Sequence, residues 1–374
     1  MRTVLWLESH TIVRKVKYFR WGHVVPTGRE QDIRKAKEVK IFDPRDPSTG
    51  SQGADLLDAT VCLRGNQWWM YLAGQAGGYG ATELFSASLS LGAPLSAGGW
   101  KLRRDSEGKL VPLAANGHSN RWDGNGGRHC PSYVTGFDSQ AGRTVERIYY
   151  AGASENLWGP YTIGFLEWNG EEWIDQAEAV FVANEAWEHG SVYEPNLIYH
   201  DGKWKMWYVA GSNQENYLVH GYAESADGRS GWTTHSIFAP PDMKMFDFCV
   251  RQRGNSFDAI FSRVWVAEGV PSSETGLWWC QCAKPSGNFS HWGQPTQIMT
   301  AEDRGWHSGP WKPSFQFDAQ SPGRAFVFFD GLYRTSDPGP FPFAFTQGCV
   351  EIELPAGRGH DSPRCDHQGG HRLR

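Results

Sequence analysis

One internal repeat constrains the fold of this chain more than any other feature of its sequence. Residues 58–74 read DATVCLRGNQWWMYLAG, and residues 194–211 read EPNLIYHDGKWKMWYVAG. Each stretch begins with an acid, continues as an alternating strand, turns at Gly-Asn or Asp-Gly, and ends in a second strand rich in aromatic residues. Trp68 follows Asp58 by ten residues, as Trp204 follows Glu194. Two strands joined by such a turn predict a β-hairpin, and the repetition predicts several copies of one unit.

The starts of these units recur along most of the chain. They fall at Asp58, Cys130, Glu194, Asp247 and Lys312, with separations of 72, 64, 53 and 65 residues. Each unit holds about four strand-like segments, and the fifth reads WKPSFQFD, RAFVFFDGLY, FPFAFTQG and VEIELP. Five four-stranded units at this period are typical of a β-propeller. The sequence therefore predicts an all-β fold, a five-bladed β-propeller of four-stranded antiparallel blades.

The unit pattern divides the chain into three parts. Residues 55–355 hold the five predicted blades. Residues 1–54 contain strand-like segments, a charged stretch, REQDIRKAKEVKIF, that fits a short helix or an exposed strand, and a Pro/Gly/Ser loop that leads into the propeller. Residues 356–374 are expected to form a disordered tail.

The composition agrees with a β fold and argues against several classes of function. The 374 residues include 19 Trp, 44 Gly and 21 Pro, which favour short strands and turns, and most of the Trp are expected to fill space between sheets. A formal net charge of −5 without a Lys/Arg block argues against a nucleic-acid partner. No apolar stretch is long enough for a membrane span. The absence of a secretory signal and seven Cys without metal-type pairing favour a cytoplasmic protein with reduced thiols.

Residues at the unit starts are expected to meet, because the first strand of each propeller blade lines the central channel. Three of the five are acids: Asp58, Glu194 and Asp247. Buried acids are costly unless they are paired, so this pattern favours a function, although strand-end capping or pairing with Arg stays open for each. Two carboxylates across a small pocket are the groups that hydrolyse glycosides: one protonates the leaving oxygen, and the other activates water or attacks the sugar.

The repeated unit also resembles a known family. An acid, a strand, a turn and an aromatic strand that ends in Ala-Gly, with Asp in the first blade and Glu in the third, is similar to the five-bladed propeller glycosidases of glycoside hydrolase family 43 and its relatives in families 32, 68 and 130. The resemblance is best over residues 55–240. It implies that Asp58 is the general base and Glu194 the general acid. The family's third acid, an Asp in the second blade, would fall on Cys130, where this chain has no carboxylate.

Other residues near the unit starts are candidates for contacts with a substrate. His129 could orient the substrate in place of the missing acid. The cations could neutralise the carboxylates or bind a carboxylate or phosphate of the substrate, and a purely structural ion pair stays open for each. Tryptophans in loops before the unit starts could stack on sugar rings at the rim of the pocket, or pack as ordinary loop residues. The remaining candidates are Asp247 and His307, the cations Arg128, Arg251 and Lys312, and the tryptophans Trp122, Trp187 and Trp306.

The predicted function is a glycoside hydrolase-like enzyme that cleaves a small glycoside, with a furanoside as one candidate. Its partner would be a small-molecule substrate, a carbohydrate. No phosphate-binding loop or HExxH motif is present, so no cofactor is expected, and a structural metal in the channel stays open. Three alternatives also stay open: a non-glycosidic acid/base reaction of a biosynthetic pathway on the same scaffold, a glycoside phosphorylase, and a non-catalytic sugar-binding propeller.

Overall fold

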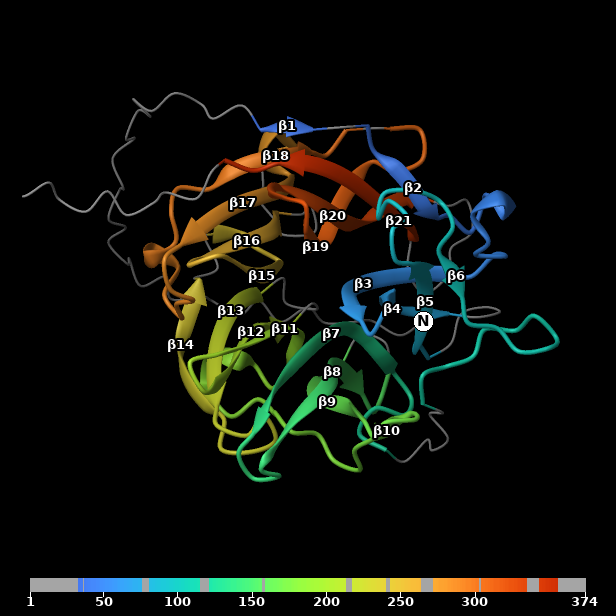
Figure 1. Ribbon diagram of the computed structural model, residues 1–374. Coiled ribbons are helices and arrows are strands. Elements are labelled where there is room, and N and C mark those ends of the chain that lie inside the picture. Colours follow the sequence, from blue (N-terminus) through green and yellow to red (C-terminus); the bar gives the residue numbers. More distant parts are fainter. Residues whose placement is uncertain are drawn as a thin grey trace, which may run out of the picture. The chain divides into compact units, whose positions relative to one another are not determined.

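Five antiparallel β-sheets make up the part of the chain that the structure describes. The structure is a computed structural model that describes residues 33–355, except 36, 76–80, 115–120, 157–158, 213–216, 240–242, 264–271, 303 and 335–342. Most of the expected N-terminal part (1–32) and the expected disordered tail (356–374) lie outside the described residues. In Figure 1 the innermost strands of the five sheets surround a common centre. This arrangement is the five-bladed β-propeller that the sequence predicts.

The first two blades each contain four antiparallel strands, and we number both the blades and their strands in chain order. Blade I consists of β3 (Asp55–Arg64), β4 (Gln67–Gln75), β5 (Glu83–Ser90) and β6 (Lys101–Leu102). Blade II consists of β7 (Gly127–Asp138), β8 (Arg143–Ala153), β9 (Tyr161–Trp168) and β10 (Trp173–Asp175). In both, the first strand is the innermost one, so the unit starts found in the sequence lie on β3 and β7 (Figure 1).

Blades III and IV repeat this order. Blade III consists of β11 (Val192–His200), β12 (Lys203–Ser212), β13 (Tyr217–Ser225) and β14 (Thr233–Ala239). Blade IV consists of β15 (Asp247–Arg253), β16 (Ser256–Arg263), β17 (Gly276–Cys282) and β18 (Thr296–Thr300). The turn between β11 and β12 confirms the hairpin predicted from Asp201-Gly202, because both residues have positive φ, 51° and 72°, as a two-residue hairpin turn of type I′ requires.

Blade V takes strands from both ends of the described chain. Its inner strands are β19 (Gly309–Asp318), β20 (Ser321–Arg334) and β21 (Phe343–Glu353). The segments FPFAFTQG and VEIELP, which the sequence analysis separated, belong to the single strand β21. The outer edge is supplied by β1 (Arg34–Lys35) and β2 (Val39–Phe42), which both pair with β21. The described part of the charged stretch, residues 33–42 except 36, thus contributes edge strands rather than a helix.

Tryptophan side chains of blade III fill the gaps between neighbouring blades. Trp204 and Trp207 are both almost fully buried on β12, and their Nε1 atoms donate in opposite directions around the ring. Trp204 donates to the Phe137 carbonyl of blade II (2.9 Å), and Trp207 donates to the Ser286 carbonyl of blade IV (3.3 Å). The aromatic strand of the repeat therefore supplies interblade packing, as expected for most of the 19 Trp.

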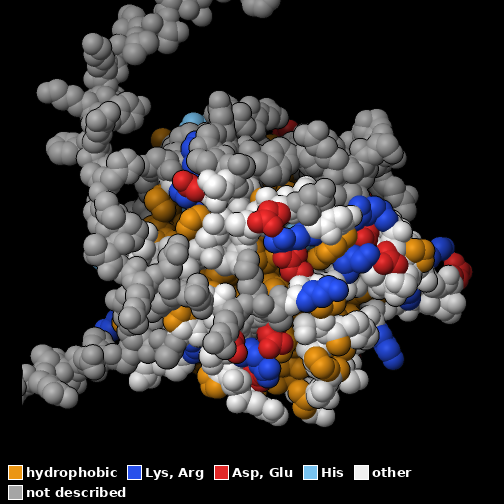
Figure 2. All heavy atoms as spheres, turned by 90° about the horizontal axis from the view of Figure 1, so that it is seen from above, with side chains coloured by type: hydrophobic (Ala, Val, Ile, Leu, Met, Phe, Trp, Pro, Cys, Tyr) orange, Lys and Arg blue, Asp and Glu red, His pale blue; other side chains and the backbone are white. Residues whose placement is uncertain are grey.

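The surface of the described residues carries both signs of charge. Figure 2 shows Lys and Arg side chains next to Asp and Glu side chains over one face. On the described part of that face, acidic and basic side chains thus lie next to one another. None of the described helical segments has the length and apolar character needed to cross a membrane. Six of the seven Cys, all buried, are free thiols.

Candidate active site

The five unit starts come together at the centre of the propeller, and we call them the inner ring: Asp58, Cys130, Glu194, Asp247 and Lys312. In four of the five blades the ring residue has a left-handed backbone, with φ between 46° and 58°, and sits in a β-bulge of the innermost strand. A non-glycine residue in this conformation costs about 1–2 kcal/mol. The bulge re-aims the side chain, so the conformation places functional groups at the centre of the ring.

Three carboxyl groups tie the inner ring together through backbone amides of the following blade. Oδ2 of Asp58 accepts from the Cys130 amide (2.9 Å), and Oδ2 of Asp247 accepts from the Lys312 amide (2.9 Å). Asp330, on β20, accepts from the Asp58 amide through both oxygens (3.0 and 2.8 Å). Asp58 and Asp247 therefore stabilise the closed ring as well as lining it, which is the structural alternative that the sequence left open.

Glu194 and Lys312 form an ion pair across the inner ring. The Lys312 Nζ donates to Oε2 of Glu194, and the two residues are 9% and 6% exposed. A buried charge without a partner is strongly destabilising, so each residue needs the other in this position. The pair joins blade V to blade III, which are not neighbours in the propeller.

Burial changes the protonation of the acids at this centre. Burial raises the pKa of Asp247 to about 7, and the negative charge of Asp58 adds to the shift. Burial also raises the pKa of Asp330 well above its usual range, with Asp58 again contributing. In blade II, burial lowers the pKa of His129 to about 4 and raises that of the Cys130 thiol. Near neutral pH the centre therefore contains a protonated Asp330, a partly protonated Asp247, a neutral imidazole and a neutral thiol.

A second layer of polar side chains lies just past the ring residues on the inner strands and repeats the interblade contacts. Thr60 accepts from the Tyr133 amide (3.4 Å), Ser132 from the Leu197 amide (3.1 Å) and Asn196 from the Val250 amide (2.9 Å). The cavity between the ring and this layer is about 20 Å³, the size of one water molecule. This cavity is too small for a sugar.

Four residues that directly precede ring residues form, together with one residue of β9, a chain of aromatic contacts that we call the aromatic belt. Its members are His129, Tyr161, Tyr193, Phe246 and Trp311, with successive ring centroids 4.9, 5.0, 6.5 and 5.0 Å apart. His129 and Trp311 are half-buried, whereas the other three are buried. Four members of the belt directly precede a unit start, so their shared position could be recognised in the sequence. Only His129 was among the predicted contact residues.

Two predicted contact residues of blade II lie within its own packing. Arg128 is fully buried, donates to Asp123 and Asp175 (2.8 Å each) and has no further charge to offer a substrate. Trp122 stacks on Tyr150, with ring centroids 5.3 Å apart. These contacts place Arg128 and Trp122 in the packing of blade II, and their contact with a substrate stays a prediction.

The other predicted contact residues also lie outside the inner ring. His307 is buried and forms a hydrogen bond with Glu38 (2.9 Å), next to the strands that close blade V. Trp306 packs at the edge of His307, and Trp187 stacks on Tyr208 of blade III. Arg251 lies four residues past Asp247 on β15 and donates to the Val250 carbonyl (2.9 Å). The structure thus brings together five of the predicted site residues: Asp58, His129, Glu194, Asp247 and Lys312. It places His307, Trp306, Trp187 and Arg251 elsewhere.

Solved structures match this architecture, although no protein-family model and no curated protein matches the sequence. A thermostable family-43 glycoside hydrolase is 13% identical with a TM-score of 0.53, covering 86% of this chain and 97% of that chain. A family 117 glycoside hydrolase from the marine bacterium Zobellia galactanivorans is 11% identical with a TM-score of 0.57, covering 86% and 90%. The fold is that of the five-bladed glycoside hydrolases.

A third match has a more specific name. The catalytic domain of a family 62 α-L-arabinofuranosidase from Coprinopsis cinerea is 12% identical with a TM-score of 0.52, covering 80% of this chain and 90% of that chain. At these identities the matches show the shape of the glycoside hydrolase scaffold and leave the chemistry of this chain to its own residues. The inner ring differs from the family pattern at Cys130, as the sequence indicated.

Proposed function

We propose that this protein is a glycoside hydrolase-like enzyme that cleaves a small glycoside, with Glu194 as the general acid and Asp58 as the base or nucleophile. The observation that carries the proposal is the placement of both carboxylates on left-handed bulges of the inner ring, in blades I and III. Both are buried, and both belong to the scaffold that glycoside hydrolases use. Paired carboxylates at such a centre suit acid/base cleavage of a glycosidic bond.

Lys312 has a defined part in this chemistry. A general acid becomes a carboxylate when it gives its proton to the leaving oxygen. The ammonium that donates to Glu194 stabilises that carboxylate form, and it opposes the return of the proton that a new reaction cycle requires. The raised pKa values of Asp247 and Asp330 limit the negative charge around Asp58 near pH 7. The ring thereby provides different environments for its two working carboxylates, which is the condition for giving them different roles.

The proposed substrate is a small carbohydrate, with a furanoside as the first candidate. The half-buried rings of His129 and Trp311 provide apolar surface beside the acids, which suits one face of a sugar. The arabinofuranosidase among the structural matches supports the choice of a furanoside as the first substrate to test.

A second candidate keeps the scaffold and changes the reaction. Cys130 stands where the family pattern has a third acid, and Lys312 already forms an ion pair with Glu194. Both features favour a non-glycosidic acid/base reaction. A phosphorylase receives less support from the structure. Of the cations proposed to bind phosphate, Arg128 is held by two carboxylates and Lys312 by one.

The test is turnover of aryl furanosides and pyranosides, with and without phosphate, by the wild type and by Glu194→Gln and Asp58→Asn. Loss of either group should lower kcat on the accepted substrate by about 10²–10⁴. The matched control is Glu224→Gln, in blade III, whose carboxylate pairs with Lys203 and Lys205 and should leave kcat unchanged. Full activity in both site variants would overturn the assignment of the acids. If the folded wild type turned over none of the glycosides, the glycosidase proposal would be overturned in favour of the second candidate.

A further inference from the structure

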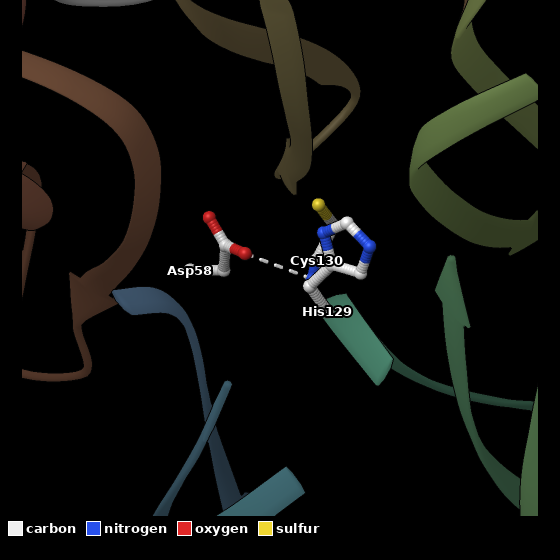
Figure 3. A group of neighbouring side chains, drawn as sticks. All are labelled: Asp58, His129 and Cys130. Carbon is white, nitrogen blue, oxygen red and sulfur yellow. Dashed lines mark hydrogen bonds between the residues drawn. The ribbon is translucent and has the colours of Figure 1, made fainter. Parts of the chain in front are cut away.

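The missing carboxylate of blade II is replaced by a set of metal-binding groups. One ligand atom each from Asp58, His129 and Cys130 lies within 4.8 Å of the other two. Figure 3 shows the three side chains gathered between the inner strands of blades I and II. We propose that these residues bind a divalent cation of the zinc type at the inner ring, where Asp58 would act as a metal ligand instead of as the free base of the proposed hydrolysis.

The β-bulge of β7 explains how two consecutive residues face one site. In a regular strand His129 and Cys130 would point to opposite faces of the sheet. The bulge breaks the register between His129 and Ser132, and Cys130 takes φ 55°. A bulge turns a neighbouring side chain towards the same side, so both residues reach Asp58.

The backbone around the three groups is already fixed by hydrogen bonds. The Cys130 amide donates to Oδ2 of Asp58 (2.9 Å), and the Asp58 amide donates to both oxygens of Asp330. Hydrogen bonds that orient the ligating residues are typical of protein metal sites.

His129 supplies an independent indication of a ligand. Its Nε2 atom is buried and has no hydrogen-bond partner within the described structure. Buried polar atoms are rarely left without a partner, and such an atom calls for an explanation. Because no hydrogen bond fixes the imidazole within the described structure, a ring nitrogen of His129 is available to a metal ion beside the thiol and the carboxylate.

The ligand types select the class of metal. A set of one carboxylate oxygen, one imidazole nitrogen and one sulfur suits Zn²⁺ and similar borderline ions, whereas Mg²⁺ and Ca²⁺ prefer oxygen ligands alone. Tetrahedral zinc with bonds of about 2.0–2.3 Å holds its ligand atoms roughly 3.4–3.8 Å apart, so side-chain movements of about 1 Å would close the site. Three protein ligands leave one position for water or an oxygen of another ligand.

The charges around the site favour a cation. Metal binding requires the thiolate, so the Cys130 proton would leave to solvent as the metal binds. The carboxylate of Asp58 and this thiolate together balance the charge of a divalent ion. Lys312, the cation of the inner ring, is engaged with Glu194.

Cobalt(II) provides a test that involves no turnover and is therefore independent of the proposed function. The full chain is freed of metal with a chelator, and Co²⁺ is titrated in while the near-ultraviolet absorption is recorded. We expect a thiolate-to-cobalt charge-transfer band that saturates at one equivalent and disappears when Zn²⁺ is added. Absence of the band in folded wild-type protein would overturn the proposal.

Variants connect the band to its ligands. Cys130→Ser should lose the band, whereas Cys282→Ser, the same change at a buried thiol of blade IV, should keep it. His129→Ala should weaken Co²⁺ binding by more than the ~10–100-fold that accompanies loss of a second-shell partner. A band that persists in Cys130→Ser, or unchanged affinity in His129→Ala, would contradict the assignment. Glu194→Gln should keep the band, so loss of turnover and loss of metal binding remain separable.

Discussion

Lys312 of blade V holds the carboxylate of Glu194 in blade III across the centre of the propeller. Both residues are in the left-handed conformation, and both are buried. The pair therefore joins two blades that share no sheet and do not adjoin. A buried carboxylate and a buried ammonium stabilise the fold only in each other's presence.

Removal of the ammonium alone should destabilise the protein strongly. Lys312→Met leaves Glu194 buried without a partner, so we expect the free energy of unfolding to fall by about 3–5 kcal/mol. The double variant Lys312→Met/Glu194→Gln should recover most of this loss. Urea unfolding measures both, with Lys203→Met, in an exposed ion pair, as a control that should change stability by about 0–1 kcal/mol. Equal stability of the single and double variants would show that the buried charge of Glu194 does not depend on Lys312.

Asp247 should make the stability of the protein depend on pH. Its pKa is raised to about 7 in the folded state and is about 3.9 in an unfolded chain, so the folded state binds more protons between these values. Stability therefore falls as pH rises from about 4 to 7, because the slope follows the difference in bound protons. Asp247→Asn should show a smaller loss between pH 5 and pH 8 than the wild type in urea unfolding. An identical loss in the two proteins would show that Asp247 ionises normally.

One glycine of blade III provides a test of side-chain packing within that blade. A Cβ at Gly221 would lie 2.2 Å from the ring of Tyr208, which is fully buried and donates to Glu188. Gly221→Ala should therefore destabilise the protein by about 1–3 kcal/mol, as overpacking of cores does. Gly98→Ala is the matched control, because a Cβ there meets no atom within 4 Å. The measurement is the melting temperature of each variant. Equal melting temperatures for the two variants would show that a Cβ at Gly221 causes no crowding.

The buried guanidinium of Arg147 should contribute far more to the free energy of unfolding than the exposed guanidinium of Arg143, which contacts the same acid, Glu167. Arg147 is fully buried and donates to Asp138, to Glu167 (3.0 Å) and to the Asp227 carbonyl of blade III (2.6 Å). Arg147→Met should lower the free energy of unfolding by about 3–5 kcal/mol, because it leaves buried acceptors and charge behind. Arg143→Met, with a side chain 55% exposed, should lower it by about 0–1 kcal/mol. Similar losses in chemical denaturation would contradict this distinction.

The fold could be predicted from the sequence because its signal is repeated. The acid at the start of a strand and the Trp ten residues later mark blades I and III, and the turn signals place the other strands. The closure of blade V escaped prediction, because β1 and β2 are short, charged edge strands whose pairing with β21 leaves no local pattern. Edge strands often carry charged side chains because these hinder pairing with another chain.

The candidate site was predictable only in part. The convergence of Asp58, Glu194, Asp247 and Lys312 follows from the equivalence of unit starts and could be read from spacing. The part played by Asp330 could not, because it lies on a second strand and reaches the ring through the Asp58 amide. Its signal is a single acid within the apolar run FVFFDG, a residue type that strands seldom bury.

The contacts of Arg128 and His307 were also beyond the sequence. A position beside a unit start does not reveal where a long side chain points, and these two side chains meet Asp123 and Glu38 instead of the ring. The bulge at Cys130 is a similar case, since its left-handed backbone brings His129 and Cys130 to one side. A register shift of this kind has no signature in residue type here, because none of the four bulged positions is Gly or Asn.

The pairing of Arg34 with Glu353 has a consequence for how this protein is made. The edge of blade V is synthesised first and its neighbour β21 almost last, so a ribosome-bound chain holds an unfinished propeller until nearly all of its described length has emerged. Asp330, which anchors Asp58, also lies in this last blade. The central carboxylates therefore acquire their final geometry only late in synthesis, and contacts of such long sequence separation are expected to make folding slow.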